Sequence, residues 1–250
     1  MRFGAIIIGD EILRGKRQDR HFAKMIELLG ARGLRLDWAE YVGDDPERIT
    51  ATLARTFAAP DAVFSFGGIG ATPDDHTRQC AAAALGVALV LHAEGERLVR
   101  ARFGAETTPL RLKMVEFPAG AAIIPNAYNQ IPGFSVREHH FLPGFPVMAW
   151  PMVESVLDTR YAHLHHRTPE AEAAIIVFGS AESTLTPLMV AVEAQYRQLK
   201  VFSLPHAGED GARRHIELGV RGDPAEVAAA IEVLKRGVVA AGATFEPSPG

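Results

Sequence analysis

Residues 62–75, AVFSFGGIGATPDD, decide the fold of this 250-residue chain. The opening AVFSF is a short apolar run, which is typical of a strand buried on both faces of a parallel sheet. The glycines Gly67, Gly68 and Gly70 follow at once and let the backbone bring its amide N–H groups close to a ligand. The next residues, from Thr72 to Asp75, have the pattern of a helix start. A strand, a glycine loop and a helix in this order indicate an α/β fold with an anion site where the strand ends.

Strand-like and helix-like segments alternate on both sides of this stretch. Strands are predicted over 3–8, 34–42, 62–66, 121–124 and 136–142, and helices over 21–29, from Pro46, and over 75–85, 94–103 and 147–157. Because helices of this length connect parallel strands by right-handed crossovers, we expect an α/β fold with a three-layer, mostly parallel sheet flanked by helices.

A second, smaller α+β unit is predicted at the carboxyl end. We expect a first domain over 1–160, a linker over 161–171 rich in polar residues, and the small domain over 172–250. The small domain should contain strands over 173–178, 201–204 and 215–220 and a helix over 186–199. Its last helix has Asp223 as N-cap, Pro224 in the first turn and Glu226 at the capping-box position.

The composition excludes several classes of protein. Hydrophobic residues make up 48% and charged residues 22%, which is typical of a globular protein and not of a disordered one. A net charge of −4 argues against a nucleic-acid binder. Cys80 is the only cysteine, so we expect no disulfide framework and a reducing compartment. No run approaches the ~20 apolar residues of a membrane span, and we therefore expect a cytoplasmic location without a membrane partner.

Generic phosphate and hydrolase motifs are absent from the sequence. There is no G-x-x-x-x-G-K-[ST] P-loop and no G-x-S-x-G elbow. The dinucleotide fingerprint also fails, because Pro73 stands where its third glycine would be needed.

Asp74 and Asp75 have two interpretations, and the sequence leaves both open. With Thr72 as N-cap, the two carboxylates could simply satisfy the first backbone donors of a helix. However, carboxylates beside a phosphate repel it, by about 1 kcal/mol per close charge pair even in water. Mg²⁺ resolves this conflict, since it binds one or two carboxylates together with phosphate oxygens. We therefore predict Mg²⁺ or another divalent cation at Asp74 and Asp75.

Two further acidic loops should meet the glycine loop. Asp10 and Glu11 follow the first strand after Gly9, and Asp44 follows the second. Because the carboxyl ends of parallel strands lie at one edge of a sheet, these side chains are expected near the same ligand. Asp45 is expected to be the N-cap of the helix that begins at Pro46.

These loops resemble the molybdopterin-binding family, which includes the molybdenum cofactor biosynthesis proteins MogA and MoaB, and more closely the N-terminal part of CinA-type proteins. The segments that carry the resemblance are 9–13 with Gly15 and Asp19, 42–45, 67–75 with Thr77, and Pro132-Gly133-Phe134 with 143–146. The unit from Ala173 onward resembles the small second domain of CinA-type proteins, notably at 221–224. His21 and Asn129 depart from the residues common in the family.

The resemblance implies a homo-oligomer, a dimer or a trimer, that binds a small phosphate-bearing molecule, either molybdopterin or a nucleotide. It implies that Asp44 and Asp75 are the catalytic residues, with Asp74 and Asp75 at the metal. The ligand-binding residues that it implies are Gly9, Asp10, Glu11, Gly67, Gly68, Gly70, Thr72, Thr77, Asn126, Gly133, Pro143 and Gly144. The nicotinamide-mononucleotide deamidase domain of the family would lie further along, so that activity is not expected here.

Three functions stay open at this point. The chain is a molybdopterin-binding type protein that holds its ligand, or a divalent-metal-dependent pyrophosphohydrolase that acts on ADP-ribose or a similar nucleotide. The third possibility is an interaction or scaffold protein whose pocket no longer binds a ligand. The first two share one pocket and differ in turnover.

Overall fold

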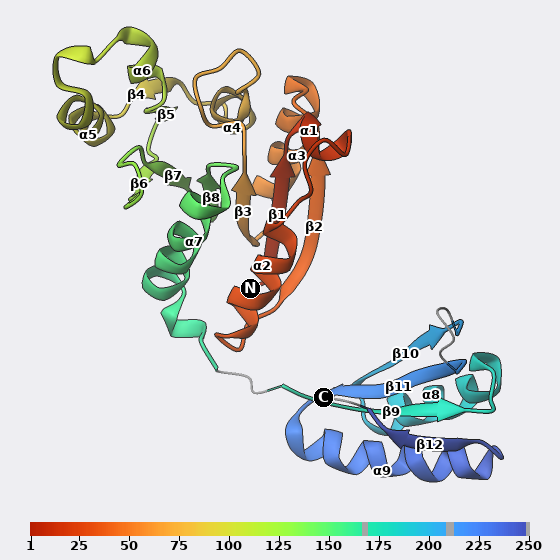
Figure 1. The fold of residues 1–250 in the computed structure, drawn as a ribbon. Helices are drawn as coiled ribbons and strands as arrows, with labels where there is room; N and C mark the ends of the chain where they lie inside the picture. Colours follow the sequence, from red (N-terminus) through yellow and green to blue (C-terminus); the bar gives the residue numbers. More distant parts are fainter. Residues whose placement is uncertain (167–169, 209–212, 249–250) are drawn as a thin grey trace. The chain divides into compact units, whose positions relative to one another are not determined.

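The chain forms two compact units, Met1–His165 and His166–Gly250 (Figure 1). The computed structural model describes residues 1–166, 170–208 and 213–248. The boundary between the units falls inside the segment 161–171 predicted as a linker, of which 167–169 lie outside the described residues. Within the described residues, no helix is both long and apolar enough to cross a membrane.

Unit 1 is built on a six-stranded sheet with the order β2-β1-β3-β8-β7-β6. Its strands are β1 (Phe3–Ile8), β2 (Leu36–Val42), β3 (Ala62–Phe66), β6 (Ala122–Ile124), β7 (Gly133–Val136) and β8 (His139–Leu142). The first four strands in this order are parallel to one another, and only β7 runs against its neighbours. The prediction of a mostly parallel α/β sheet is therefore confirmed.

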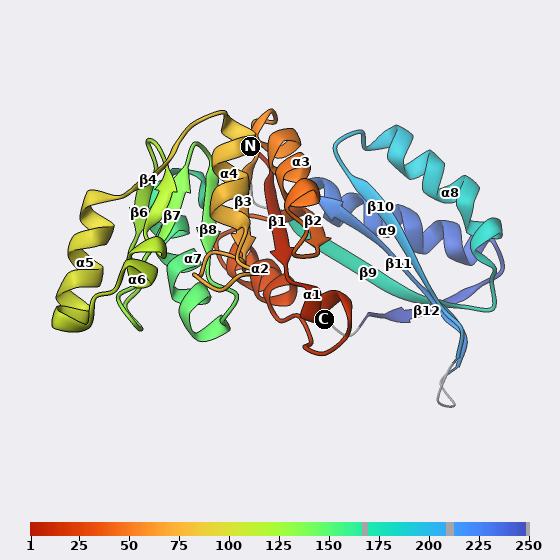
Figure 2. The same ribbon diagram turned by 90° about the horizontal axis from the view of Figure 1, so that it is seen from above.

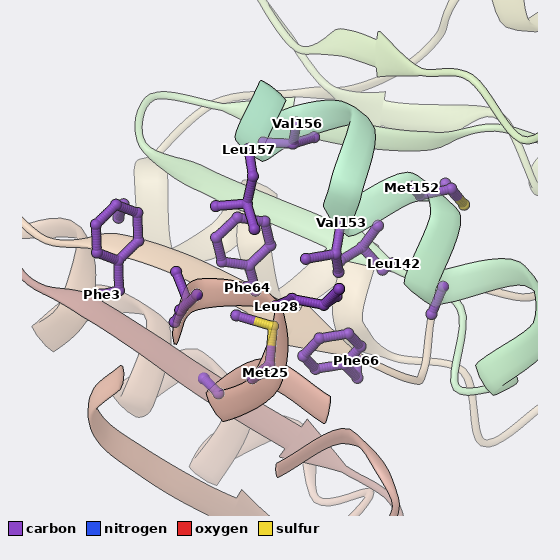
Figure 3. Close-up of a cluster of buried hydrophobic side chains, with 14 of the residues drawn as sticks. Phe3, Met25, Leu28, Phe64, Phe66, Leu142, Met152, Val153, Val156 and Leu157 are labelled. Atoms are coloured by element: carbon purple, nitrogen blue, oxygen red, sulfur yellow. The ribbon is translucent and has the colours of Figure 1, made fainter. Parts of the chain in front are cut away.

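Helices cover both faces of this sheet, which gives three layers (Figure 2). Alternate residues of β1 enter two separate cores, as expected for a strand buried on both faces. One core joins Phe3 and Ile7 to α2 (His21–Gly30) and α7 (Pro146–Arg160), and Figure 3 shows Met25, Leu28 and Val153 of these helices around Phe64 and Phe66. The other core joins Ile6 and Ile8 to α3 (Pro46–Phe57) and α4 (Thr77–Leu85).

The remaining elements complete unit 1. They are α1 (Asp10–Leu13), β4 (Leu89–Leu91), α5 (Ala93–Phe103), η1 (Gly104–Glu106), α6 (Pro109–Lys113), β5 (Glu116–Pro118) and η2 (Ala162–Leu164). Of these, β4 and β5 pair as a separate two-stranded sheet, and Val99 of α5 and Phe117 of β5 belong to the second core.

A buried chain of hydrogen bonds ties the β7–β8 hairpin to the end of α7. The hydroxyl of Tyr161 donates to the Glu138 carboxylate, with 2.6 Å between the oxygens. That hydroxyl therefore accepts from Nε2 of His140 at 2.7 Å, and Nδ1 of His140 accepts from the Ser135 hydroxyl at 2.8 Å. Burial lowers the pKa of His140 to about 3, so this histidine stays neutral at physiological pH.

In the described part of unit 2, a four-stranded antiparallel sheet is covered by two helices. The strands are β9 (Ala171–Phe178), β10 (Lys200–His206), β11 (His215–Gly222) and β12 (Thr244–Pro247), in the order β10-β11-β9-β12. The helices α8 (Glu182–Gln195) and α9 (Pro224–Ala240) share a core with β9 and β11. The prediction of a small α+β unit is confirmed. The predicted cap of α9 is confirmed as well, since the Asp223 carboxylate accepts from the amides of Ala225 and Glu226.

Two predicted elements were wrong. The segment 136–142 is not one strand, because the chain turns between β7 and β8 at Arg137, which takes a φ of 52°. No glycine or asparagine marks this turn, so it could not be predicted from the residues. The helix predicted over 186–199 begins earlier, at Glu182, and ends at Gln195, with Pro187 inside it.

Candidate functional site

Unit 1 contains a pocket of about 440 Å³ at the carboxyl ends of its parallel strands. Ile8 and Gly9 line it where β1 ends, Asp44 after β2, Gly67 after β3, and Pro143 after β8. Ligands bind at this edge in open α/β sheets, because loops and helix N-termini converge there. The acidic loops and the glycine loop therefore meet at one edge, as the strand pattern predicts.

The glycine loop passes too close to its neighbours to carry side chains. Gly67 has a φ of 100°, and a Cβ there would lie 2.3 Å from the carbonyl oxygen of Ile8. Gly68 has a φ of 66°, and a Cβ there would lie 2.2 Å from Oγ1 of Thr77. Thr77 is fully buried behind the loop and donates from Oγ1 to the Gly67 carbonyl at 3.0 Å. Thr77 thus fixes the loop from behind and does not line the pocket.

The helix predicted over 75–85 begins only at Thr77, so the interpretation of Thr72 as its N-cap is wrong. The side chain of Asp75 folds back and accepts from the Thr72 amide at 2.8 Å, which closes the loop before the helix begins. The Thr72 hydroxyl lies 2.5 Å from Oδ2 of Asp75 and 2.6 Å from Oδ1 of Asp74. The hydrogen bond from Thr72 also holds the pKa of Asp74 below its usual value.

Three oxygens are consequently grouped in the pocket wall, on Thr72, Asp74 and Asp75. A hydroxyl has a single proton, so Thr72 can donate to only one of the two carboxylates at a time. An oxygen-only donor set of this kind suits a hard divalent cation. Across the described part of the chain, no group of three or more His, Cys, Asp or Glu side chains is placed to hold a metal.

Asp44 lines the pocket, whereas Asp10 does not and lines a separate cavity. The two residues exchange hydrogen bonds: the Asp10 amide donates to Oδ2 of Asp44 at 2.8 Å, and the Asp44 amide donates to Oδ1 of Asp10 at 3.2 Å. Burial raises the pKa of Asp44, and the charges of Asp10, Glu11 and Asp74 add to this effect, while the bond from the Asp10 amide opposes it. The structure thus places Asp10 as a support for Asp44.

The charge of the pocket is strongly negative. The carboxylates of Glu11, Asp44, Asp74 and Asp75 line it, and Arg17 is the one cationic side chain among the lining residues. The Arg17 guanidinium lies 3.8 Å from Glu11 and 5.6 Å from the ring centre of Phe145. An anion would meet net repulsion here unless a cation accompanied it.

The remaining predicted residues divide into two groups. Those that line the pocket are Gly9, Glu11, Gly67, Gly68, Gly70, Thr72, Asn126, Pro143 and Gly144, whereas Asp10, Thr77 and Gly133 do not. Gly133 lies inside the sheet, where a Cβ would be 2.4 Å from the Phe141 carbonyl oxygen. Asn126 is buried and uses its side chain to fix the following turn, through bonds to Asn129, Ile131 and Tyr128.

Part of the pocket lining is apolar and was not predicted from the sequence. It consists of Ile69, Met114, Ile131 and Met148. Ile131 and Met148 flank the Pro132-Gly133 and Pro143-Gly144 segments, which could have pointed to them, whereas nothing in the sequence marks Met114. Such a wall can hold a flat ring.

A second cavity of about 220 Å³ adjoins the pocket and shares Ile8, Glu11, Arg17, Gly144 and Phe145 with it. His21 lines this cavity and stacks on Phe66, with 4.3 Å between the ring centres. Burial lowers the pKa of His21, and Nε2 of the neutral ring donates to the Gly144 carbonyl at 3.1 Å.

Unit 1 is thus an α/β domain with a pocket at the carboxyl ends of its parallel strands, and its sequence places it in a known family. A family model described as a probable molybdopterin binding domain matches residues 4–163, and the chain belongs to this family. A CinA-like protein of Anaeromyxobacter sp. (strain Fw109-5) is 32% identical over 235 residues, which cover 86% of this chain and 57% of the relative. A second one, from Anaeromyxobacter dehalogenans (strain 2CP-C), is 36% identical over 154 residues, or 59% of this chain and 38% of the relative.

The fold is also shared with a solved structure, the protein CinA with unknown function from Thermoplasma acidophilum. That structure superimposes with a TM-score of 0.58 at 26% identity and covers 63% of this chain and 98% of its own. These likenesses confirm the resemblance to molybdopterin-binding and CinA-type proteins. The chain spans only 38% and 57% of the lengths of the two CinA-like relatives.

Proposed function

We propose that unit 1 binds a phosphate-bearing pterin or adenine nucleotide in its pocket, together with Mg²⁺ or another divalent cation. The observation that carries this proposal is the wall formed by residues 67–75, where a glycine loop and the oxygens of Thr72, Asp74 and Asp75 face one cavity. A volume of about 440 Å³ is within the usual range for small-molecule sites.

The residues would divide the work according to their chemistry. The backbone at Gly67, Gly68 and Gly70 can approach a phosphate closely, because no side chain stands in the way. Asp74 and Asp75 would hold the cation, whose remaining ligands would be phosphate oxygens and water. Four carboxylates and one guanidinium leave the pocket with excess negative charge. When bound, the cation would offset this charge. The apolar wall would hold the ring of the ligand.

Isothermal titration calorimetry with AMP, ADP-ribose and a pterin phosphate, each with and without Mg²⁺, tests this proposal. We expect binding that requires Mg²⁺ and is weakened about tenfold or more by Asp75→Asn. Asp158→Asn is the matched control, since Asp158 is an exposed carboxylate of unit 1 that pairs with Arg32. If the ligands bind equally well without Mg²⁺ and to Asp75→Asn, the metal has no part in binding. If none of the ligands binds, the proposal is overturned.

A second candidate is hydrolysis of the phosphoanhydride in ADP-ribose, and the position of Asp44 favours it. This carboxylate lines the pocket, and its raised pKa makes it a better proton acceptor at neutral pH than an ordinary aspartate. Water would lose a proton to Asp44 and attack phosphorus, and the bond to the bridging oxygen would break to give AMP and ribose 5-phosphate. Chromatographic detection of AMP tests this, with Asp44→Asn expected to keep binding and lose turnover. If Asp44→Asn turns over as the wild type does, Asp44 has no such role.

We also propose a cytoplasmic homo-oligomer, a dimer or a trimer, on the strength of the family alone. Light scattering on the purified protein tests the subunit number, and a monomer at micromolar concentration would contradict it.

A further inference from the structure

Arg78, the second residue of α4, is a buried cation that the sequence analysis did not single out. Only 2% of its surface is exposed. Its guanidinium donates to three backbone carbonyls: Nη2 to Gly70 at 2.6 Å, and Nη1 to Lys113 and to Glu116, the latter at 3.3 Å. Burying a guanidinium costs free energy, so we expect Arg78 to have a role beyond packing.

These three bonds join two walls of the pocket that are far apart in the sequence. Gly70 belongs to the glycine loop, and the other two carbonyls flank Met114. Both Gly70 and Met114 line the pocket. Without Arg78, the three carbonyls would lose a common donor, and nothing else in the described residues bonds to Gly70 from the Met114 side.

In the described part of the chain the Arg78 guanidinium forms no ion pair, and the carboxylates of Glu116 and Asp75 act on its charge only from a greater distance. Within residues 1–166, 170–208 and 213–248, no carboxylate lies at ion-pair distance from its guanidinium, and its buried Nε has no hydrogen-bond partner. A positive charge therefore lies beneath the loop that faces the pocket. Charges in a low-dielectric interior act over longer distances than charges in water.

We infer that Arg78 is a positioning residue that holds the glycine loop at a fixed distance from the Met114 wall and favours a phosphate over an uncharged group at that loop. The second half of this inference rests on the proposed function, whereas the first half does not. Arg78 itself does not line the pocket, so it acts through Gly70 and through its charge.

The first test is hydrogen exchange on the ligand-free full chain with Arg78→Met, Arg78→Lys and the control Arg111→Met. Arg111 is a cation of α6 that also donates to a backbone carbonyl, that of Glu106, but lies outside the pocket wall. We expect residues 70–75 and 113–116 to lose protection together in Arg78→Met, less in Arg78→Lys, and not in the control. If either segment keeps its protection in Arg78→Met, the link between the walls is refuted.

The second test compares AMP with adenosine by calorimetry in the presence of Mg²⁺. We expect Arg78→Met to lower the affinity for AMP about tenfold and the affinity for adenosine less than about twofold. Arg78→Lys should keep most of the AMP affinity. A purely structural role would weaken both ligands alike, and that result would overturn the preference for phosphate. If the wild type binds neither ligand, the proposed nucleotide binding and the phosphate preference fall together, and the exchange result alone decides the positioning role.

Discussion

Replacement of Gly68 by alanine should destabilise unit 1 by two separable effects. Its φ of 66° is a left-handed conformation, which costs a non-glycine residue about 1–2 kcal/mol. The new Cβ would also stand 2.2 Å from Oγ1 of the buried Thr77, so the loop or α4 must shift. Forced shifts in a packed interior typically cost about 1–3 kcal/mol. The expected total is about 2–5 kcal/mol.

Gly86→Ala separates the two effects. Gly86 ends α4 with a φ of 67°, and a Cβ there meets no atom within 4 Å, so it carries the backbone cost alone. The assay is urea unfolding followed by tryptophan fluorescence, because the only two tryptophans, Trp38 and Trp150, both lie in unit 1. We expect Gly68→Ala to lose at least about 1 kcal/mol more than Gly86→Ala. Equal losses would refute the idea that the loop is packed tightly against Thr77.

The same fluorescence assay tests three further predictions. Tyr161→Phe deprives Glu138 and His140 of a hydrogen-bond partner and should cost about 1.5–3 kcal/mol, while Tyr128→Phe, at an exposed position, should cost nothing measurable. Burial lowers the pKa of His139 to about 4 and that of His140 to about 3, so the unfolded chain takes up protons first. Stability should therefore be complete above about pH 6.5 and be lost as the pH falls towards 4, and equal urea midpoints at pH 7 and pH 5 would contradict this. Asp10→Ala should cost about 1 kcal/mol more than Asp10→Asn, which keeps an oxygen for the Asp44 amide; equal costs would mean that this bond is unimportant.

The sequence sufficed for β1 and β3 of unit 1 because these strands are buried on both faces, but it did not reveal the separate strand β7. Runs such as Phe3–Ile8 and Ala62–Phe66 have no polar alternative, and the glycines at 67 and 68 admit only a tight turn against β1 and α4. Once parallel strands were predicted, the convergence of the acidic and glycine loops followed from geometry.

One error arose where a side chain competes with the backbone. Thr72 looked like an N-cap, but Asp75 bonds back to the Thr72 amide, and only the folded loop reveals which partner wins. Asp10 was predicted to contact the ligand; in the structure its amide and its carboxylate bond to Asp44, and its contact with a ligand stays a prediction. Arg78 gave no signal, because its partners are carbonyls of residues up to 38 positions away.

The strand order has a consequence for synthesis on the ribosome. In the order β2-β1-β3-β8-β7-β6, the strand β8 occupies a central position, although it is made after β7 and β6. The pocket also needs Pro143, Gly144 and Met148. A nascent chain with fewer than about 150 residues outside the ribosome therefore exposes the flank of β3 as an unpaired edge, and such edges are prone to wrong pairing. Premature termination or a slow codon stretch before β8 should for this reason be more harmful than the same event within unit 2, which begins only after unit 1 is complete.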